Sequence, residues 1–341
     1  MGLEHAARIN RARGLELAGF VHPDGRGRVQ PGFEGIPVES SVEALARRTK
    51  IDGAIIATPN RQHVDDVEQC AALRLPMLVE KPMADTLVGA LAAVKAIEGS
   101  GVPALIGYHR IYSPVIEEAA AILASGELGR PVCVRGCAKY LKPAAYFEPR
   151  GWRTEAGGGP LKINFVHDIA SMTRLLGPVE AVQAMASSRI RGFDVEDTAA
   201  ITFCFASGVL GSFLVSDCVA SCESWESATC DNPRFPHYPM EACYEISGTS
   251  GSLKVPNLEV ISADAENPSW ESPFRRAAIG IVQADPWDRQ LAHFADVIAG
   301  AAAPRVTARF GLHVAAIGSA IDRSIATGAR AFVPAAFPET N

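Results

Sequence analysis

Apolar runs of strand length alternate with amphipathic helical segments over roughly the first third of the chain. The run 52–58 is apolar almost throughout, as in a strand covered on both faces of its sheet. Val42, Leu45 and Ala46 share one face of a helix, and Ser40 or Ser41 can cap the start of that helix. Such alternation across short turns predicts a doubly wound parallel sheet. We expect strands over 15–21, 52–58, 76–79 and 103–108, and helices over 1–9, 41–48, 62–74 and 86–98.

The alternation of strands and helices ends after residue 108, and strands begin to follow one another directly. Turns at 206–208 and 248–251 predict antiparallel hairpins, and Gly300 and Gly328 are placed as glycines that end helices. This half therefore predicts an α+β domain with an open, mostly antiparallel sheet. We expect strands over 132–140, 179–187, 198–205, 209–216, 243–247 and 253–255, and helices over 113–125, 161–176, 286–299 and 309–327.

Composition limits the classes of protein to consider. A length of 341 residues suggests two domains, which we place at 1–109 and 110–335. A net charge of −6 without a Lys/Arg cluster argues against nucleic acid, and no apolar stretch is long enough to span a bilayer. The visible N-terminus lacks the apolar region of a secretory signal, and the eight cysteines contain no CxxC pair. We therefore expect reduced thiols in the cytoplasm and no metal site.

Chemistry is concentrated where the strand 76–79 ends in Glu80, Lys81 and Pro82. Ligands of open parallel sheets bind beyond the carboxyl ends of the strands. Pro82 cannot continue a central strand, so the chain must turn where Lys81 projects, and the Lys81–Pro82 bond can be cis. Taken alone, Lys81 would be read as a surface lysine on a turn.

Three motifs in this order resemble the Gfo/Idh/MocA oxidoreductases, the glucose–fructose oxidoreductase and inositol dehydrogenase relatives. They are Thr58-Pro59-Asn60 with His63, then Glu80-Lys81-Pro82, then three glycines at 157–159 before a helix containing His167. The resemblance runs from Gly2 to the end of the chain, including the segment 195–198 and the turn 248–251. It implies an NAD- or NADP-binding Rossmann domain over 1–109. It also implies a substrate-binding domain over 110–335 whose open sheet joins copies into a homo-oligomer, a dimer or tetramer.

The resemblance assigns the catalytic roles. Lys81 would hold the substrate hydroxyl and stabilise the alkoxide that develops during hydride transfer. His167 would be the general base, since its ordinary pKa near neutrality suits removal of a hydroxyl proton. The resemblance also implies that Glu80 orients the Lys81 amine. Without the resemblance, His167 would be read as an ordinary core histidine and Glu80 as a solvated carboxylate.

The chain departs from its relatives before His167. They commonly have an aspartate four residues earlier on the same helical face, where this sequence has Ile163. Asn164 lies on a neighbouring face and is our candidate to bind the substrate or the imidazole. Asp168 follows His167 directly, so which of Asn164 and Asp168 is its partner stays open.

The remaining site residues also follow from the resemblance. Arg110, at the crossing between the domains, would bind the substrate together with Lys81, Asn164 and His167. Trp152-Arg153 matches a Trp-Arg pair that approaches nicotinamide or substrate. The residues expected to bind the cofactor are Gly2, His22, Thr58, Pro59, Asn60, His63, Glu80, Lys81 and Arg153.

Two departures concern the cofactor. His22 replaces the acidic residue that usually binds the adenosine ribose, and Arg26 and Arg28 are nearby, so NADP competes with NAD. Aligning His5-Ala6 with the relatives makes Gly2 the third glycine of the phosphate-binding motif, with the first strand and the first two glycines missing. We expect a start codon assigned too far downstream, in preference to a degenerate protein.

The sequence thus predicts an NAD(P)-dependent dehydrogenase that transfers hydride between nicotinamide and a secondary alcohol or ketone of a sugar, polyol or related cyclic substrate. Two alternatives remain open. One is a non-catalytic ligand sensor or scaffold with a degenerate cofactor site. The other is an enzyme that keeps NAD bound and cleaves a glycosidic bond through transient oxidation.

Overall fold

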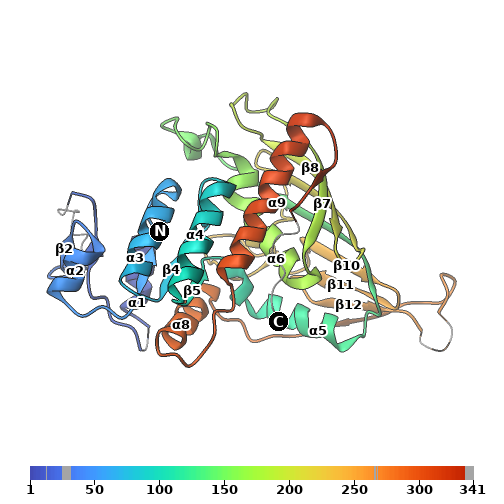
Figure 1. Cartoon of the computed structure of the whole chain (residues 1–341). Helices are drawn as coiled ribbons and strands as arrows, with labels where there is room; N and C mark the ends of the chain where they lie inside the picture. Colours follow the sequence, from blue (N-terminus) through green and yellow to red (C-terminus); the bar gives the residue numbers. More distant parts are fainter. Residues whose placement is uncertain (13, 25–31, 265, 267, 335–341) are drawn as a thin grey trace. The chain divides into compact units, whose positions relative to one another are not determined.

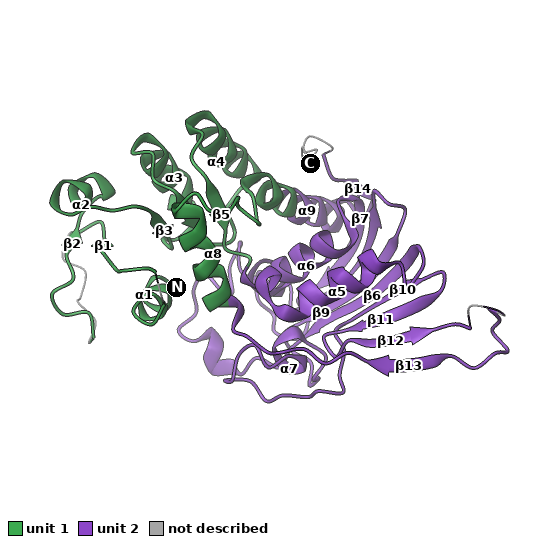
Figure 2. Cartoon of the chain, turned by 90° about the horizontal axis from the view of Figure 1, so that it is seen from below, with its two compact units in different colours: residues 1–108, 287–315 green, residues 109–286, 316–341 purple. Residues whose placement is uncertain are grey.

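The computed structural model describes residues 1–12, 14–24, 32–264, 266 and 268–334. Arg26 and Arg28 of the sequence analysis lie outside these residues. The chain forms two compact units (Figures 1 and 2). Unit 1 contains residues 1–108 and 287–315, and unit 2 contains residues 109–286 and 316–341. The predicted domains at 1–109 and 110–335 stay predictions, and the compact units differ from them in assigning 287–315 to unit 1.

Unit 1 contains two parallel sheets. Strands β3 (Ala54–Ile56), β4 (Met77–Val79) and β5 (Ala104–Ile106) pair in that order, and all six residues of β4 and β5 are buried. Strands β1 (Phe20–Val21) and β2 (Val38–Glu39) form a separate parallel pair. The parallel sheet predicted for this half is confirmed. Its strands are shorter than expected because only the central residues of each apolar run enter the ladder.

Helices cover both faces of the three-stranded sheet. Leu78 and Leu105 pack against Phe294 and Val297 of helix α8 (Pro286–Ile298). Because side chains alternate along a strand, Met77 and Val79 face the opposite side, where α3 (His63–Ala72) contacts β4. Helix α4 (Leu87–Ser100) packs beside α3. The unit also contains α1 (Gly2–Ile9), the turn η1 (Asn60–Gln62) and α2 (Val42–Arg48), which Ser41 caps as predicted.

Unit 2 is built on a nine-stranded sheet in the order β13-β12-β11-β10-β6-β9-β8-β7-β14. Every neighbouring pair is antiparallel except β6 with β9, which confirms the mostly antiparallel sheet. The strands are β6 (Pro131–Lys139), β7 (Val179–Ser187), β8 (Thr198–Phe205), β9 (Leu210–Ser216), β10 (Tyr244–Gly248), β11 (Gly251–Val255), β12 (Glu259–Ser262), β13 (Arg275–Ala278) and β14 (Ala331–Phe332).

One face of this sheet is packed against helices and the other is open. Phe165, at the start of α6 (Val166–Leu176), contacts the rings of Phe203 and Phe213. Ser324 of α9 (Ala308–Thr327) accepts the N–H of Ala184 at 2.9 Å. Figure 2 shows α5 (Pro114–Ser125) and α6 side by side over the strands. The unit also contains η2 (His109–Tyr112), η3 (Ala144–Phe147), η4 (Leu161–Phe165) and α7 (Trp225–Ala228).

Several local predictions are confirmed and a few elements were missed. Gly300 and Gly328 end their helices at φ of 70° and 69°, and the Lys81–Pro82 bond is cis. The helix expected over 161–176 begins instead with the π-helical turn η4. Strand β13 was missed because its four residues are all exposed, so it has no apolar alternation to detect. In the described part of the chain, no helix is long and apolar enough to cross a membrane.

Candidate functional site

In unit 1, Glu80 and Lys81 directly follow the last residue of β4. Glu80 is 4% exposed, and one carboxylate oxygen lies 2.8 Å from Nε2 of His5. Its other oxygen accepts the main-chain N–H of Lys81 at 3.1 Å. Gly107, in the loop after β5, leaves room for this carboxylate, because a Cβ there would lie 3.1 Å from Glu80. Glu80 therefore fixes the backbone from which the Lys81 side chain projects.

His5 is a residue of this site that sequence reasoning used only for alignment. It is 2% exposed, and its ring lies 5.2 Å from that of Trp287, which Arg8 also approaches. Arg8 in turn donates to Asp288 at 2.6 Å. The second half of α1 is thereby joined to the start of α8, and His5 links both to Glu80. A histidine on the buried face of α1 was the available signal, but its partner lies 75 residues away along the chain.

The loop after β3 is held by His63. This histidine is fully buried, and its two ring nitrogens lie 2.9 Å from the carbonyl oxygens of Thr58 and Pro82. The Thr58 hydroxyl donates to Asp66 at 2.6 Å. Pro59 and Asn60 are exposed between these anchors. His63 thus joins the loops that follow β3 and β4, and it leaves the turn 59–60 accessible to a ligand.

The arrangement of unit 1 fits a dinucleotide. Because β3, β4 and β5 are parallel, their carboxyl ends meet at one edge of the sheet, where such folds bind nucleotides. Gly2, the first residue of α1, lies against Ala57 just beyond β3, since a Cβ there would come 3.9 Å from that of Ala57. A helix N-terminus favours the negative charge of a phosphate. His22, just after β1, is exposed and lies 2.6 Å from the Asp24 carboxylate.

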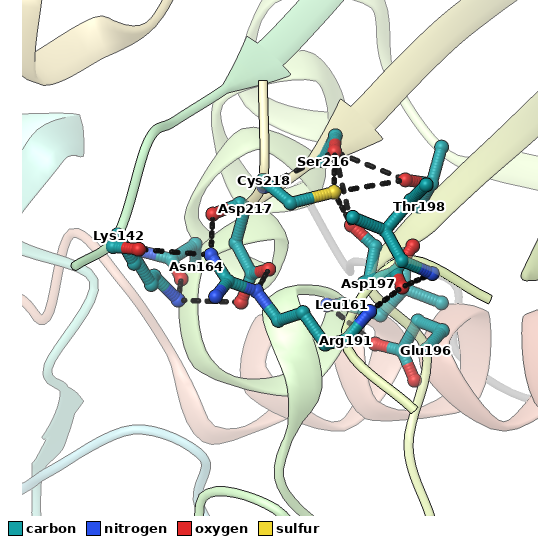
Figure 3. Close-up of polar contacts among 11 residues, drawn as sticks. Lys142, Leu161, Asn164, Arg191, Glu196, Asp197, Thr198, Ser216, Asp217 and Cys218 are labelled. Carbon is teal, nitrogen blue, oxygen red and sulfur yellow. Dashed lines mark hydrogen bonds and ion pairs between the residues drawn. The ribbon is translucent and has the colours of Figure 1, made fainter. Parts of the chain in front are cut away.

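In unit 2, the segment that carries Asn164 and His167 starts from a glycine turn and a carboxylate. Gly157 and Gly159 have φ of 96° and 78°, which favour glycine. A Glu196 oxygen accepts the N–H of Leu161 at 2.9 Å (Figure 3). Burial raises the pKa of Glu196, against the lowering effect of this hydrogen bond. Glu196 thus fills the role of a helix cap at the first residue of η4.

Asn164 and His167 lie at the junction of η4 and α6. The Asn164 side-chain oxygen accepts a hydrogen bond from Nζ of Lys142 at 2.7 Å. His167 is 7% exposed, and its ring meets that of His109 edge to face at 4.8 Å between centroids. Turns of π-helix interrupt α-helices frequently at functional sites. Lys142 was not singled out by the sequence, because it lies just after the strand β6 with no motif around it.

Arg110 and Asp168 belong to a buried polar network in the same unit. Arg110 donates to Asp168 at 3.1 Å and to Glu226 at 2.5 Å, and the Tyr244 hydroxyl also donates to Asp168. Burial raises the pKa of Asp168 to about 6, although Arg110 opposes the shift. The guanidinium that we expected to bind substrate thus has two carboxylate partners of its own, and its role toward a ligand stays a prediction.

Arg153 lies beside an aromatic pair. Its guanidinium carbon is 4.6 Å from the centre of the Tyr146 ring and 5.3 Å from that of Trp152, and it donates to the Tyr146 carbonyl at 3.1 Å. The predicted site residues are therefore divided between the units. Unit 1 holds Gly2, His22, Thr58, Pro59, Asn60, His63, Glu80 and Lys81, and unit 2 holds Arg110, Arg153, Asn164 and His167.

Comparison with known proteins gives matches over most of the chain. Residues 1–108 match a family model described as the oxidoreductase family with an NAD-binding Rossmann fold. Residues 116–254 match the GFO/IDH/MocA C-terminal domain. A 1,5-anhydro-D-fructose reductase of Ensifer adhaerens is 28% identical over 331 residues, covering 93% of this chain and 91% of the relative.

Two further matches extend over most of both aligned chains. An inositol 2-dehydrogenase of Rubrobacter xylanophilus is 30% identical over 270 residues, which is 76% of this chain and 69% of that protein. The crystal structure of an oxidoreductase from Agrobacterium radiobacter in complex with NAD+, L-tartaric acid and magnesium aligns with a TM-score of 0.78 at 18% identity. That alignment covers 97% of this chain and 95% of the other, and it shows a shared fold.

Proposed function

This chain belongs to the Gfo/Idh/MocA oxidoreductases, and on that basis we propose that it transfers hydride between NAD or NADP and a secondary alcohol or ketone of a sugar, polyol or related cyclic compound. Relatives named as an anhydro-sugar reductase and an inositol dehydrogenase support this class of substrate. The observation that carries the proposal is the placement of Lys81 directly beyond β4, on a backbone fixed by the buried Glu80 and His5.

Lys81 supplies positive charge at the reacting oxygen. As the hydroxyl proton leaves ahead of the hydride, the alcohol oxygen gains negative alkoxide charge, which it loses when the hydride departs and the carbonyl forms. A fixed ammonium beside that oxygen stabilises the charge without reorganisation at the moment of reaction. Glu80 positions this amine through the Lys81 main chain, so its contribution is geometric.

His167 accepts the hydroxyl proton in the oxidative direction and returns it in the reductive direction. Its low exposure, together with the neighbouring ring of His109, restricts the imidazole to few orientations. Asn164 binds the substrate one helical turn before it. We propose that Lys81 and His167 both serve the same hydride-transfer reaction.

The nicotinamide cofactor supplies or accepts the hydride when bound. We propose that Gly2, the turn Thr58-Pro59-Asn60, Glu80 and Lys81 hold it, since they lie at the start of α1 and at the carboxyl ends of β3 and β4. His22, whose ring lies 2.6 Å from Asp24, is our candidate to contact the ribose after β1. Arg153, in unit 2, contacts the nicotinamide or the substrate.

We also propose that the protein is cytoplasmic and assembles as a homo-oligomer through the open face of its sheet. All eight cysteines are free thiols, which persist in reducing compartments. The open face exposes Met185 (74%), Leu210 (60%) and Leu214 (54%). Exposed apolar side chains gathered on one sheet face favour burial against a second copy.

Reduction of NAD+ and NADP+ by a panel of polyols, aldoses and their acids tests the proposal with the full-length protein. We expect at least one compound to produce NADH or NADPH, followed at 340 nm, and Lys81→Met to lower kcat about 100-fold or more. The control is Lys50→Met, because Lys50 is 85% exposed and pairs only at the surface with Asp52. Near-normal turnover in Lys81→Met, or release of a cleaved product without net reduction, would contradict the proposal.

A further inference from the structure

A basic cluster lies around Asn164 in unit 2. Lys142 and Arg191 both contact the Asp217 carboxylate (Figure 3), and Arg153 lies against the same aromatic ring as Lys142. The Tyr146 ring lies near two of the cations, with Nζ of Lys142 4.9 Å and the guanidinium carbon of Arg153 4.6 Å from its centre. Lys142 and Arg191 share the Asp217 carboxylate, and Glu226 also acts electrostatically on Lys142.

Lys142 is held firmly at both backbone atoms. It follows the bridge between Leu141 and Cys218, and its N–H donates to the Asp217 carbonyl at 3.0 Å. Its own carbonyl accepts a hydrogen bond from Arg191 at 3.0 Å. The side chain is 11% exposed, and burial lowers the pKa of the amine against the opposing effect of Asp217. Such an ammonium is costly to bury unless negative charge is nearby.

Asp217 supplies only part of the negative charge that the buried Lys142 ammonium requires. Its carboxylate accepts from Nε of Arg191 at 2.6 Å, whereas Nζ of Lys142 is 3.5 Å away. Arg191 is fixed in this pairing because Asp197 accepts the main-chain N–H groups of Ile190 and Arg191, both at 2.9 Å. The other Asp217 oxygen faces Lys142 at the longer distance. Of the three ammonium donors, one bonds Asn164, one points toward Asp217, and one is left for a ligand.

The contact between Lys142 and Asn164 determines which end of the Asn164 amide is left to contact a ligand. A lysine ammonium has three donors and no acceptor, so it must face the oxygen of the Asn164 amide, at 2.7 Å. The Asn164 NH2 group is then the part of the amide that remains to bind a ligand. Both side chains consequently offer N–H donors, which suits an acceptor without hydrogens of its own.

We propose that Lys142 and Asn164 bind a carboxylate of the substrate, so that the enzyme acts on sugar acids or related hydroxy acids in preference to neutral polyols. The inference deepens the proposed function, since it rests on Asn164 lying one helical turn before the proposed base His167. A single carboxylate fits better than a phosphate, because Arg191 already donates to Asp217 and to the Lys142 carbonyl and has less capacity for a second negative charge.

Calorimetric binding to the full-length protein tests this inference without requiring turnover. The probes are D-gluconate and D-glucuronate, with D-glucitol and D-glucose as their neutral counterparts. We expect wild type to bind at least one acid about tenfold or more tightly than its counterpart, and Lys142→Met to remove most of that preference. Lys142→Arg, which keeps the charge, should retain more of the preference than Lys142→Met.

The matched control is Lys139→Met, which removes the same charge three residues earlier. Lys139 pairs with Glu223 and lines the open face of the sheet, so it should leave the preference unchanged. Equal affinity of wild type for the acids and their counterparts would overturn the inference, as would an acid preference that survives Lys142→Met. Lys142-dependent acid binding without NAD(P)+ reduction would instead reject the proposed function alone, whereas turnover of neutral polyols without acid preference would reject this inference alone.

Discussion

Asp168 places a carboxylate in a fully buried position next to His167. Its side chain is 0% exposed, and Arg110 and Tyr244 donate to the same oxygen. Desolvation nevertheless dominates, so the pKa of this carboxyl rises from 3.8 to about 6 in the folded state. Asp168 is therefore neutral over part of the mildly acidic range in which an exposed aspartate is charged.

This shift gives stability a defined dependence on pH. A carboxyl whose folded pKa is raised contributes stability that is fully present below its unfolded pKa near 4 and is lost as pH rises through about 6. In urea unfolding, we expect the difference in unfolding free energy between wild type and Asp168→Asn to fall by on the order of 2 kcal/mol from pH 4 to pH 7.

The exposed Asp52→Asn provides the control, since it should follow the wild-type dependence on pH. A difference between wild type and Asp168→Asn that stays constant across this range would contradict the account of Asp168. A rising difference would show instead that Arg110 and Tyr244 outweigh desolvation.

At the scale of elements, the start of η4 and α6 depends on Gly159 and Glu196. A Cβ at position 159 would overlap the Glu196 carboxylate that accepts the N–H of Leu161. Displacing this carboxylate would release the first turn of the segment that carries Asn164 and His167. The geometry of both proposed site residues thus depends on the absence of a side chain at Gly159.

We therefore expect Gly159→Ala to destabilise the protein by about 2 to 3 kcal/mol and to lower kcat. Gly157→Ala is a close control, because Gly157 also has positive φ but a Cβ there meets nothing within 4 Å. The control should cost about 1 to 2 kcal/mol, from backbone strain alone. Thermal unfolding and initial rates of both variants check this, and equal losses in the two would exclude a role for Glu196.

Most elements were predictable from local pattern, because burial against a neighbour leaves periodic apolar positions. Strands β7 and β8 begin and end at the residues that the sequence predicts, and α5 begins one residue later and ends where predicted. The packing of α8 under the sheet of unit 1 was not predictable, because Phe294 and Val297 meet Leu78 and Leu105 from nearly 200 residues away. The π-helical turn of η4 was also missed, since its apolar spacing is close to that of an α-helix.

The candidate site likewise contains residues that the sequence can single out and residues that only the structure identifies. Lys81 and His167 stand in motifs whose order is informative, so a sequence alone can single them out. Trp287 and Lys142 stand in no such motif, and His5 served only to align the chain; their importance comes from contacts with His5, Asn164 and Glu80 respectively. Arg110 was chosen for its place at the crossing between the domains, but its pairing with Asp168 and Glu226 depends on elements that a motif does not describe.

At the scale of the whole molecule, the proposed assembly through the open sheet face can be tested directly. Leu214, at the centre of β9, is 54% exposed on that face. Replacing it by glutamate would bury a charge in the interface, so we expect Leu214→Glu to weaken self-association at least tenfold. Light scattering across a concentration series measures this.

Val88→Glu is the matched control, because Val88 is 77% exposed on α4 in unit 1. It should leave the mass in solution unchanged. A wild-type protein that is monomeric at all concentrations, or a Leu214→Glu variant that associates as wild type does, would contradict the assembly through the sheet.

The central claim is that Lys81 and His167 serve one hydride-transfer reaction, and a double-mutant cycle of kcat/KM tests it most directly. Groups that act as a unit are strongly non-additive, whereas independent groups add. With Lys81→Arg, His167→Asn and the double variant, we predict that the double variant is within about threefold of the slower single variant. Losses that simply multiply would contradict the joint action of Lys81 and His167 in this reaction.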